Sequence, residues 1–375
     1  MINNNEEKNI SRRATPIAIQ KQLEKKDDYN INHNVVTTNL LTKDIKINKK
    51  KTIMKNYFAK LENPGINICF LNTAIQFILS IKSLSELICF GYVRKFCKTS
   101  TFLSEFEQLE MLENPNQSIS EITVAKKDFL YEFETLAINM IKNPKRILST
   151  AKLAKIFEIL EPGYIYSHQW DCSEVVDRFF TLFEDFINNE NFEGKCNALE
   201  ILNSLKVTMK VSTQCNQCNT IKILESEDFF FFVPLEKDVH NIFTEFSCLI
   251  NDFRCEMCNA LAGNRDLRLV TGAVQKTEIM SFSKYILIKF GRVKFNHDKV
   301  LYKVTLSENN CVLQQNFKLD AWVDHTGKSI KCGHYYLIRR VEDVFVKISD
   351  DVLSIYNIKS IHKSDLCYIA LLRLF

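Results

Sequence analysis

The sequence lacks any run of about 18 or more consecutive apolar residues, so it contains no obvious candidate for a membrane-spanning helix. It also lacks an apolar stretch near its start, where MINNNEEKNISRR is polar and charged. We therefore expect no secretory signal. These two absences predict a soluble, intracellular protein of the cytoplasm, the nucleus or both, without a membrane partner.

An excess of charge of one sign is missing as well. The 49 Lys and Arg residues against 45 Asp and Glu residues give a net charge of +4, and the basic residues are spread along the chain. Proteins that bind nucleic acid usually gather their basic residues in a patch or stripe. We therefore expect no nucleic-acid partner.

Cysteine is abundant, but the conditions for a disulfide framework are absent. The 13 cysteines are an odd number in a long chain, and no secretory signal accompanies them. Disulfide scaffolds are typical of short secreted chains. Reduced thiols and metal ligands are the better interpretation.

The chain has enough apolar material for a large core, with 46% hydrophobic residues and 28 Phe among 375 residues. Residues 1–55 differ from the rest because they are rich in Asn, Lys, Asp, Glu and Thr, show no sustained apolar period and end in a basic run. This composition predicts a disordered N-terminal arm. Residues 56–375 are expected to form one elaborated domain.

Two kinds of apolar pattern divide this domain. Apolar residues at helical spacing predict one helix from Phe70 to about Phe90 and another from Ser173 to about Ile187. Beyond about residue 205 the pattern changes to short β-rich runs, among them LKVTMKVST, DFFFFVPL, YILIKFGRVKF and HYYLIRRV. A helical half therefore precedes a β-rich half, and we expect an α+β fold.

Two CxxC units lie in the β-rich half, one with Cys215 and Cys218 and the other with Cys255 and Cys258. Each unit can present two thiolates to one tetrahedral zinc ion, and two units complete a four-cysteine site. Ordinary buried cysteines and a redox CxxC are the alternatives, but a redox motif is normally single. A zinc ion closed by four thiolates has no open coordination position, so its role would be structural.

Cys69 lies in NPGINICFLNTAIQ, at or just before the start of the first predicted helix. The positive end of a helix lowers the pKa of a thiol and so raises the fraction of reactive thiolate. A cysteine at an apolar helix start is, however, more often a packed small residue. The local context of Cys69 leaves both interpretations open.

Several longer segments resemble those of one enzyme family. NICFLNTAIQ resembles the nucleophile box of the ubiquitin-specific proteases, which are cysteine deubiquitinases, and places Cys69 at the nucleophile position. HQWDCSEVVDRFF is similar to that family's QQDAQEFL box, and YILIKFGRVKF resembles its LxIxLKRF strand. FKLDAWVDHTGKSIKCGHYYLIRR is close to the YxLxAVVxHxGxxxxGHYxAYxR box, which places His334 at the base position. The boxes follow one another in the family's order.

The resemblance implies a papain-like cysteine protease fold for residues 56–375, with a helical thumb, a β-rich palm and zinc-ribbon fingers over about 205–265. It further implies hydrolysis of an amide, usually an isopeptide bond, after the C-terminal glycine of ubiquitin. Ubiquitin or ubiquitinated proteins are then the expected partners, and zinc is the expected cofactor. Cys69 would attack the carbonyl, while His334 would take the thiol proton and later protonate the leaving amine.

The base and its orienting partner each have a neighbour in the sequence that competes for the role. His325 lies close to His334, but Gly333 and Tyr335 flank His334 as the family pattern requires. The family's third residue is usually the first acid of a WxxFDD-like strand. Here that strand reads FVKISDD, so the resemblance leaves both Ser349 and Asp350 as candidates to orient the imidazole.

The oxyanion position departs from the family pattern. The family's usual Asn, five residues before the nucleophile, corresponds to Pro64, which offers neither a side-chain nor a backbone donor. Asn63, one position away, and Asn67, within the nucleophile box, are the candidate oxyanion residues. Loss of one such donor can cost about 3 kcal/mol of transition-state stabilisation. A catalytically weak or inactive ubiquitin-binding adaptor is therefore the alternative to an active protease.

The second box supplies candidate substrate-binding residues, namely Gln169, Asp171 and Glu174. The resemblance implies that acids here pair with the arginines of ubiquitin's tail. The alternative is that the two carboxylates stabilise the start of a helix. A zinc-ribbon interaction protein outside the family would not explain the ordered boxes.

Overall fold

The computed structural model describes most of the chain beyond the predicted arm. The described residues are 59–99, 117–161, 163–165, 168–190, 192, 194–239, 245–262, 269–293, 299–329, 332–358 and 361–375. All of them belong to one unit of the chain, Lys49–Phe375. The predicted arm over residues 1–55 lies outside the described residues.

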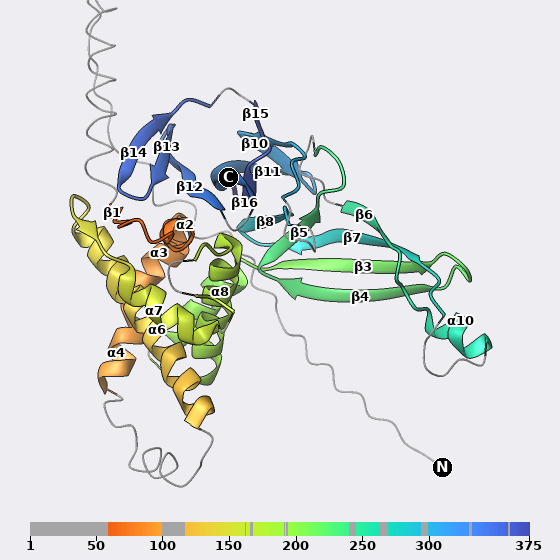
Figure 1. Ribbon diagram of the computed structural model, residues 1–375, viewed down its shortest axis with the longest axis horizontal. Helices are drawn as coiled ribbons and strands as arrows, with labels where there is room; N and C mark the ends of the chain where they lie inside the picture. The colour runs from red at the N-terminus through yellow and green to blue at the C-terminus, as the bar shows by residue number, and fades with distance from the viewer. Residues whose placement is uncertain are drawn as a thin grey trace, which may run out of the picture. The chain divides into compact units, whose positions relative to one another are not determined.

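Helices form most of the first half of this unit, as the apolar spacing predicted (Figure 1). They are α2 (Cys69–Ile78), α3 (Lys82–Cys89), α4 (Tyr92–Thr99), α6 (Gln117–Lys142), α7 (Ala151–Leu160), α8 (Cys172–Asn189) and α9 (Lys195–Asn203). A short helix, α10 (Glu256–Leu261), follows within the β-rich half.

The prediction of one helix from Phe70 to about Phe90 is wrong, because α2 and the helical segment that follows it meet at a bend of 93°. Ser80 donates its hydroxyl to the carbonyl of Gln76 at 2.9 Å, and Ile81 is extended. Serine hydroxyls that bond the backbone in this way favour the end of a helix. No single described helix is long and apolar enough to cross a membrane. Together, α2 and the helical segment after the bend meet the length and composition criteria for a membrane span. All of α2 is, however, buried inside the protein.

The larger sheet has eight strands, with seven in the order β14-β13-β12-β11-β16-β8-β5 and β10 paired to β11. Only the pairing of β5 with β8 is parallel within it. The strands are β5 (Phe230–Pro234), β8 (Tyr285–Gly291), β10 (Asn309–Val312), β11 (Gln315–Ser329), β12 (Cys332–Val341), β13 (Val344–Ser349), β14 (Val352–Tyr356) and β16 (Cys367–Leu374).

A second sheet of four antiparallel strands has the order β4-β3-β7-β6. Its strands are β3 (Val207–Cys215), β4 (Ile221–Asp228), β6 (Glu245–Ile250) and β7 (Ala273–Phe282). Figure 1 shows β3, β4 and β7 running together away from the helices, toward α10. Two small pairs complete the described strands: β1 (Lys60–Leu61) with β2 (Ile147–Leu148), and β9 (Val304–Ser307) with β15 (Ile361–Ser364).

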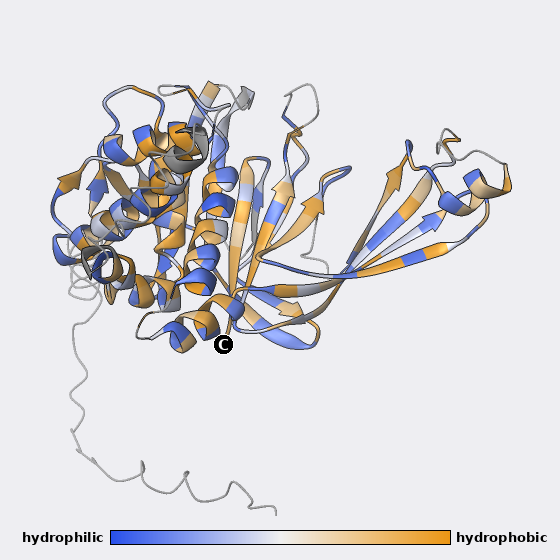
Figure 2. Cartoon of the chain, turned by 90° about the horizontal axis from the view of Figure 1, so that it is seen from below, coloured by the Kyte–Doolittle hydropathy of each residue, from blue (hydrophilic) through white to orange (hydrophobic). Residues whose placement is uncertain are grey.

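The larger sheet is buried on both faces, which explains the continuous apolar run in β8. Tyr285 and Leu287 belong to the core shared with the helices, whereas Ile286 and Ile288 belong to a second core on the opposite face. Successive side chains of a strand point to opposite faces, so a strand buried on both sides needs apolar residues at every position. The hydropathy colouring shows such apolar strands beside helices in which hydrophobic and hydrophilic residues are interleaved (Figure 2).

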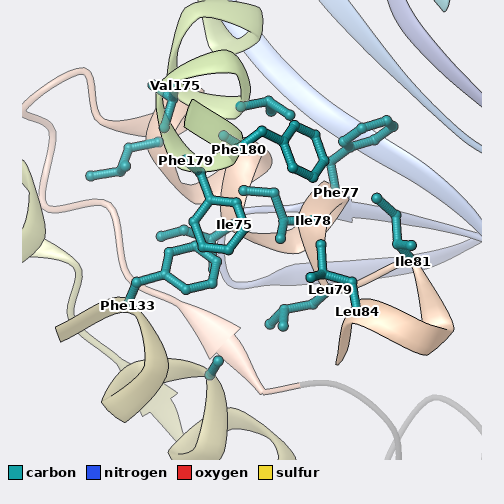
Figure 3. Packing of buried hydrophobic residues seen from close by; sticks show 14 of the residues in the cluster. Ile75, Phe77, Ile78, Leu79, Ile81, Leu84, Phe133, Val175, Phe179 and Phe180 are labelled. Atoms are coloured by element: carbon teal, nitrogen blue, oxygen red, sulfur yellow. The ribbon is translucent and has the colours of Figure 1, made fainter. Parts of the chain in front are cut away.

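Helix α2 lies between the larger sheet and the other helices, since it contacts β12, β11 and β13 as well as α8. Figure 3 shows Ile75 and Ile78 of α2 close to Phe179 of α8. The ring of Phe179 packs against that of Phe133 from α6, with centroids 4.3 Å apart. Packing against the sheet and against the helices therefore holds α2 in place, and the first of its ten buried residues is Cys69.

Candidate active site

Cys69 begins α2 and is only 2% exposed. The chain enters the helix through Asn67, whose φ of 55° marks a left-handed turn that Asn tolerates well. Burial raises the pKa of the Cys69 thiol, although the backbone N–H of Tyr335 opposes the shift by bonding toward the sulfur. The charge of Asp350 raises this pKa further. The thiol is therefore predominantly protonated at neutral pH in this arrangement.

His334 lies on β12, one residue before Tyr335, whose backbone N–H faces the thiol. The side chain of His334 is 37% exposed. Its Nε2 lies 2.7 Å from the hydroxyl of Ser349, the last residue of β13, and 3.9 Å from a carboxylate oxygen of Asp350. Among the described residues no hydrogen bond joins Cys69 to His334. With Nε2 engaged by Ser349, Nδ1 is the imidazole nitrogen left for the thiol.

The carboxylate of Asp350 accepts its side-chain hydrogen bonds from two amides and not from the imidazole of His334. Its carboxylate accepts from Asn63 Nδ2 at 3.0 Å and from Asn72 Nδ2 at 2.8 Å. The hydroxyl of Thr150 donates to Asn72 Oδ1 at 2.7 Å, which fixes the amide orientation. Asp350 itself has a φ of 50° at the turn after β13. The acid therefore ties the segment before α2 to the end of β13.

Sequence reasoning did not single out Asn72 or Thr150 as members of this network. A usable signal existed for Asn72, because a polar side chain in the middle of a wholly buried helix must find hydrogen-bond partners. Nothing comparable marks Thr150, which precedes α7 and is 1% exposed. Its contact with Asn72 depends on how α7 packs.

The two candidate oxyanion residues lie in different surroundings. Asn63 is partly buried, and besides the bond to Asp350 its Oδ1 accepts from the backbone N–H of Gly65 at 3.2 Å. Asn67 is exposed, as is Pro64. The Asn63 amide is thus held in place from both ends, next to the loop that leads into Cys69.

The three candidate substrate residues also differ from one another. Gln169 is 8% exposed, and its Nε2 lies 2.9 Å from Nε2 of His325. Asp171 caps α8 by accepting from the backbone N–H of Ser173 at 2.8 Å, which is the helix-start role weighed for it. Glu174 is exposed and pairs with Lys289 at 3.2 Å. Burial raises the pKa of Asp171, against the opposing bond from Ser173.

His325, the competing histidine, is completely buried. Burial, the charge of Lys299 and then that of His334 lower its pKa to about 3. The ring is therefore neutral at any working pH. A group that neither reaches solvent nor takes up a proton near neutral pH is poorly suited to act as the base.

The four cysteines of the CxxC units come together at the far end of the four-stranded sheet. Cys215 Sγ lies 3.8 Å from Cys258 Sγ, and Cys218 Sγ lies 3.6 Å from Cys255 Sγ. All four sulfurs lie within 4.8 Å of one another. A tetrahedral ion with metal–sulfur distances of about 2.3 Å requires sulfurs about 3.8 Å apart. The group therefore has the spacing to bind a metal ion.

Comparison with known proteins gives a family assignment for nearly the whole described region. The sequence model of the family described as ubiquitin carboxyl-terminal hydrolase matches residues 59–371. The search of curated proteins returned no match. This family has a papain-like fold and is typical of ubiquitin-specific proteases, which act on ubiquitin and ubiquitinated substrates. The mixed helical and β-rich structure, the motif order and the family match agree: the chain belongs to the ubiquitin carboxyl-terminal hydrolase family.

Proposed function

We propose that the protein is a thiol-dependent deubiquitinase that hydrolyses the peptide or isopeptide bond after the C-terminal glycine of ubiquitin. The observation that carries the proposal is the 2.7 Å contact between His334 Nε2 and Ser349, beside the buried start of α2 at Cys69. A histidine oriented through one nitrogen keeps the other for a nucleophile, which is the logic of catalytic triads.

In the proposed reaction His334 takes the proton of the Cys69 thiol, and the sulfur attacks the carbonyl carbon to form a tetrahedral intermediate. The C–N bond then breaks, and His334 returns the proton to the leaving amine. Water, activated by the same histidine, cleaves the resulting thioester and frees the ubiquitin carboxylate. Because the resting thiol is protonated, proton transfer to His334 has to precede or accompany attack.

Ser349 is proposed to orient the imidazole as the third member of the triad, with Asp350 adding a negative charge 3.9 Å away. Asn63 is proposed as the oxyanion donor, because Pro64 stands where the family pattern has its usual Asn. Its Nδ2 has a second N–H beyond the one donated to Asp350. Asn67 is the second candidate donor on the same loop.

The acids of the second box keep a proposed role toward the arginines of ubiquitin's tail. One oxygen of Asp171 is used in the cap of α8, which leaves the other for a substrate group. Lys289 already pairs with Glu174, so an incoming arginine would compete with it. Gln169 would act on the substrate only through a rearrangement of its buried contact with His325.

For the four-cysteine group we propose a structural zinc ion. Cys215 and Cys218 flank the turn after β3, while Cys255 and Cys258 begin α10, so one ion would join both segments. Four thiolate ligands leave no position for water, so the ion would stabilise the fingers and take no part in hydrolysis. Less than about half an equivalent of zinc in freshly purified protein would contradict this assignment.

A ubiquitin molecule with a C-terminal electrophile tests the proposed activity directly. A covalent adduct should form with the wild-type chain and disappear in Cys69→Ala, while Cys172→Ala, which removes another buried cysteine, should leave it intact. If no adduct forms at high probe concentration although ubiquitin binds, the protein is the ubiquitin-binding adaptor instead.

A further inference from the structure

The buried His325 lies on β11, directly across from the part of β12 that carries His334. His325 is the cross-strand neighbour of Tyr335, and their rings stack with centroids 4.2 Å apart and an angle of 23°. Tyr368 from β16 closes the other side at 5.5 Å in an edge-on arrangement. Because side chains alternate along β12, Tyr335 points to the face opposite that of His334. The His325 ring thus packs against β12 on the face opposite that of His334.

Gly333, on the other side of His334, brings the backbone onto the same ring. A Cβ atom at Gly333 would lie 2.5 Å from His325 Nε2 and 1.9 Å from the carbonyl oxygen of Thr326. Neither contact is sterically allowed, and the φ of 151° is itself unfavourable for other residues. Both neighbours of His334 therefore rest on the imidazole of His325.

One contact holds the ring of His325 and two others hold its backbone. Gln169 Nε2 donates to His325 Nε2 at 2.9 Å, from the segment just before α8. The backbone N–H of His325 donates to the carbonyl of Leu366 at 2.9 Å, and the Lys299 ammonium donates to the His325 carbonyl. An amide nitrogen only donates, so its imidazole partner must be unprotonated. The contacts thus fit a neutral, immobile ring.

We propose that His325 is a positioning residue that sets the place of the His334 imidazole through Gly333 and Tyr335, with Gln169 locking its ring. The inference rests on the proposed function, since it assumes that His334 is the base. In this proposal Gln169 supports the base through His325 and does not contact ubiquitin directly. Because His325 is completely buried, it would act through these neighbours and not by contact with the substrate.

Two variants of the full-length protein separate this role from a general contribution to stability. His325→Phe keeps a flat ring but loses the bond to Gln169, and Gln169→Met removes the amide at similar length. Both should lower kcat by about tenfold to a hundredfold, because misplacement of a catalytic group by about 1 Å can cost two orders of magnitude. KM for a ubiquitin substrate should change less than about threefold, and the double variant should lose no more than the worse single variant.

Trp322→Phe is the matched control, because Trp322 lies on the same strand, is fully buried and belongs to the core on the opposite face. It should lower stability while keeping kcat per active site, counted by titration with the electrophile probe. If His325→Phe and Gln169→Met behave like this control, the proposal is wrong. A rise in KM with unchanged kcat in Gln169→Met would overturn it too, since that result indicates substrate contact.

An NMR spectrum of the His334 imidazole in a Cys69→Ala background keeps the test independent of activity. His325→Phe should shift or broaden the His334 Nε2 signal, whereas Trp322→Phe should not. An unchanged His334 signal would overturn the positioning role even in a protein that hydrolyses nothing. A wild-type chain without turnover would contradict the proposed function, while the NMR result would still decide the role of His325.

Discussion

At the scale of single residues, Ser349 gives His334 a neutral partner where a carboxylate would give a charged one. A neutral hydrogen bond contributes about 0.5 to 1.5 kcal/mol, and a charge-assisted one roughly twice as much. The nearby charge of Asp350 is already shared between Asn63 and Asn72. The strength of the proposed triad therefore depends on Ser349 more than the acidic pair in the sequence suggests.

Ser349→Ala is expected to lower kcat about threefold to tenfold, the equivalent of one neutral hydrogen bond. Ser349→Asp should restore or exceed the wild-type kcat, because it supplies a charge-assisted bond to Nε2. Steady-state hydrolysis of a ubiquitin C-terminal fluorophore measures both, with Ser354→Ala on the exposed side of β14 as the control. Full activity in Ser349→Ala together with loss in Asp350→Asn would show that Asp350 orients the base.

The raised pKa of Cys69 makes a second prediction at this scale. Only the thiolate reacts with iodoacetamide, and below its pKa the thiolate fraction rises about tenfold per pH unit. Since burial and Asp350 raise the pKa above the ordinary value of 9.0, the alkylation rate should still climb between pH 7 and pH 9. Mass spectrometry of the Cys69 peptide gives the rate. A rate that levels off below pH 7 would indicate a preformed thiolate–imidazolium pair.

At the scale of elements, the helices are joined by contacts that no local pattern announces. Glu134 of α6 is 3% exposed, and its carboxylate accepts the backbone N–H groups of Val93 at 3.3 Å and Arg94 at 2.6 Å. These groups belong to the first turn of α4, where donors have no partner within the helix. Glu134 therefore caps a helix from a distant part of the chain.

This cap should make stability depend on pH. Burial raises the pKa of Glu134 from 4.5 to about 7, against the opposing backbone bonds. Between these two values the folded state keeps a proton that the unfolded state releases. The free energy of unfolding should therefore fall as pH rises through this window, by up to about 3 kcal/mol.

Glu134→Gln stays neutral at every pH, so its free energy of unfolding should lose most of this slope. Urea denaturation at pH 5, 6, 7 and 8 provides the comparison. Glu86→Gln on the exposed side of α3 serves as the control and should keep the wild-type slope. Equal slopes in wild type and Glu134→Gln would show that the carboxylate does not retain its proton in the fold.

At the scale of the whole described unit, Lys289 joins a helix of the first half to a strand of the larger sheet. Lys289 of β8 has a side chain that is 20% exposed, and its ammonium lies 2.6 Å from Asp177 and 3.2 Å from Glu174 of α8. The charges of these acids raise the pKa of Lys289 against the effect of burial. The ion pair fixes α8, and with it the predicted substrate residues, against the sheet that carries His334.

Lys289→Ala should lower the free energy of unfolding by about 1 to 3 kcal/mol, because it leaves the partly buried Asp177 without its partner. Lys276→Ala removes a comparable lysine with two acidic partners from the four-stranded sheet, and should lower the free energy of unfolding by less than Lys289→Ala does, because solvent screens its ion pairs. Urea denaturation compares the two variants. Equal losses would mean that the Lys289 contacts add no more than a surface pair.

The sequence by itself determined the family, the order of helical and β-rich halves, the four cysteines that gather in one cluster and the segments that hold Cys69 and His334. These features depend on residue types at fixed short spacings, which a linear pattern preserves. The apolar pattern did not predict the bend between α2 and α3, where a serine hydroxyl donates a hydrogen bond to the backbone.

Only the tertiary structure decided which groups surround the candidate nucleophile and base. Asn63 meets Asp350 across 287 positions of the chain, and Gln169 meets His325 across 156. Such contacts depend on strand register and on how α2, α7 and α8 pack against the sheet, and no local spacing encodes them. The FVKISDD segment leaves both Ser349 and Asp350 as candidates to orient the imidazole. In the fold Ser349 lies 2.7 Å from the imidazole, whereas Asp350 accepts from two amides and lies 3.9 Å away.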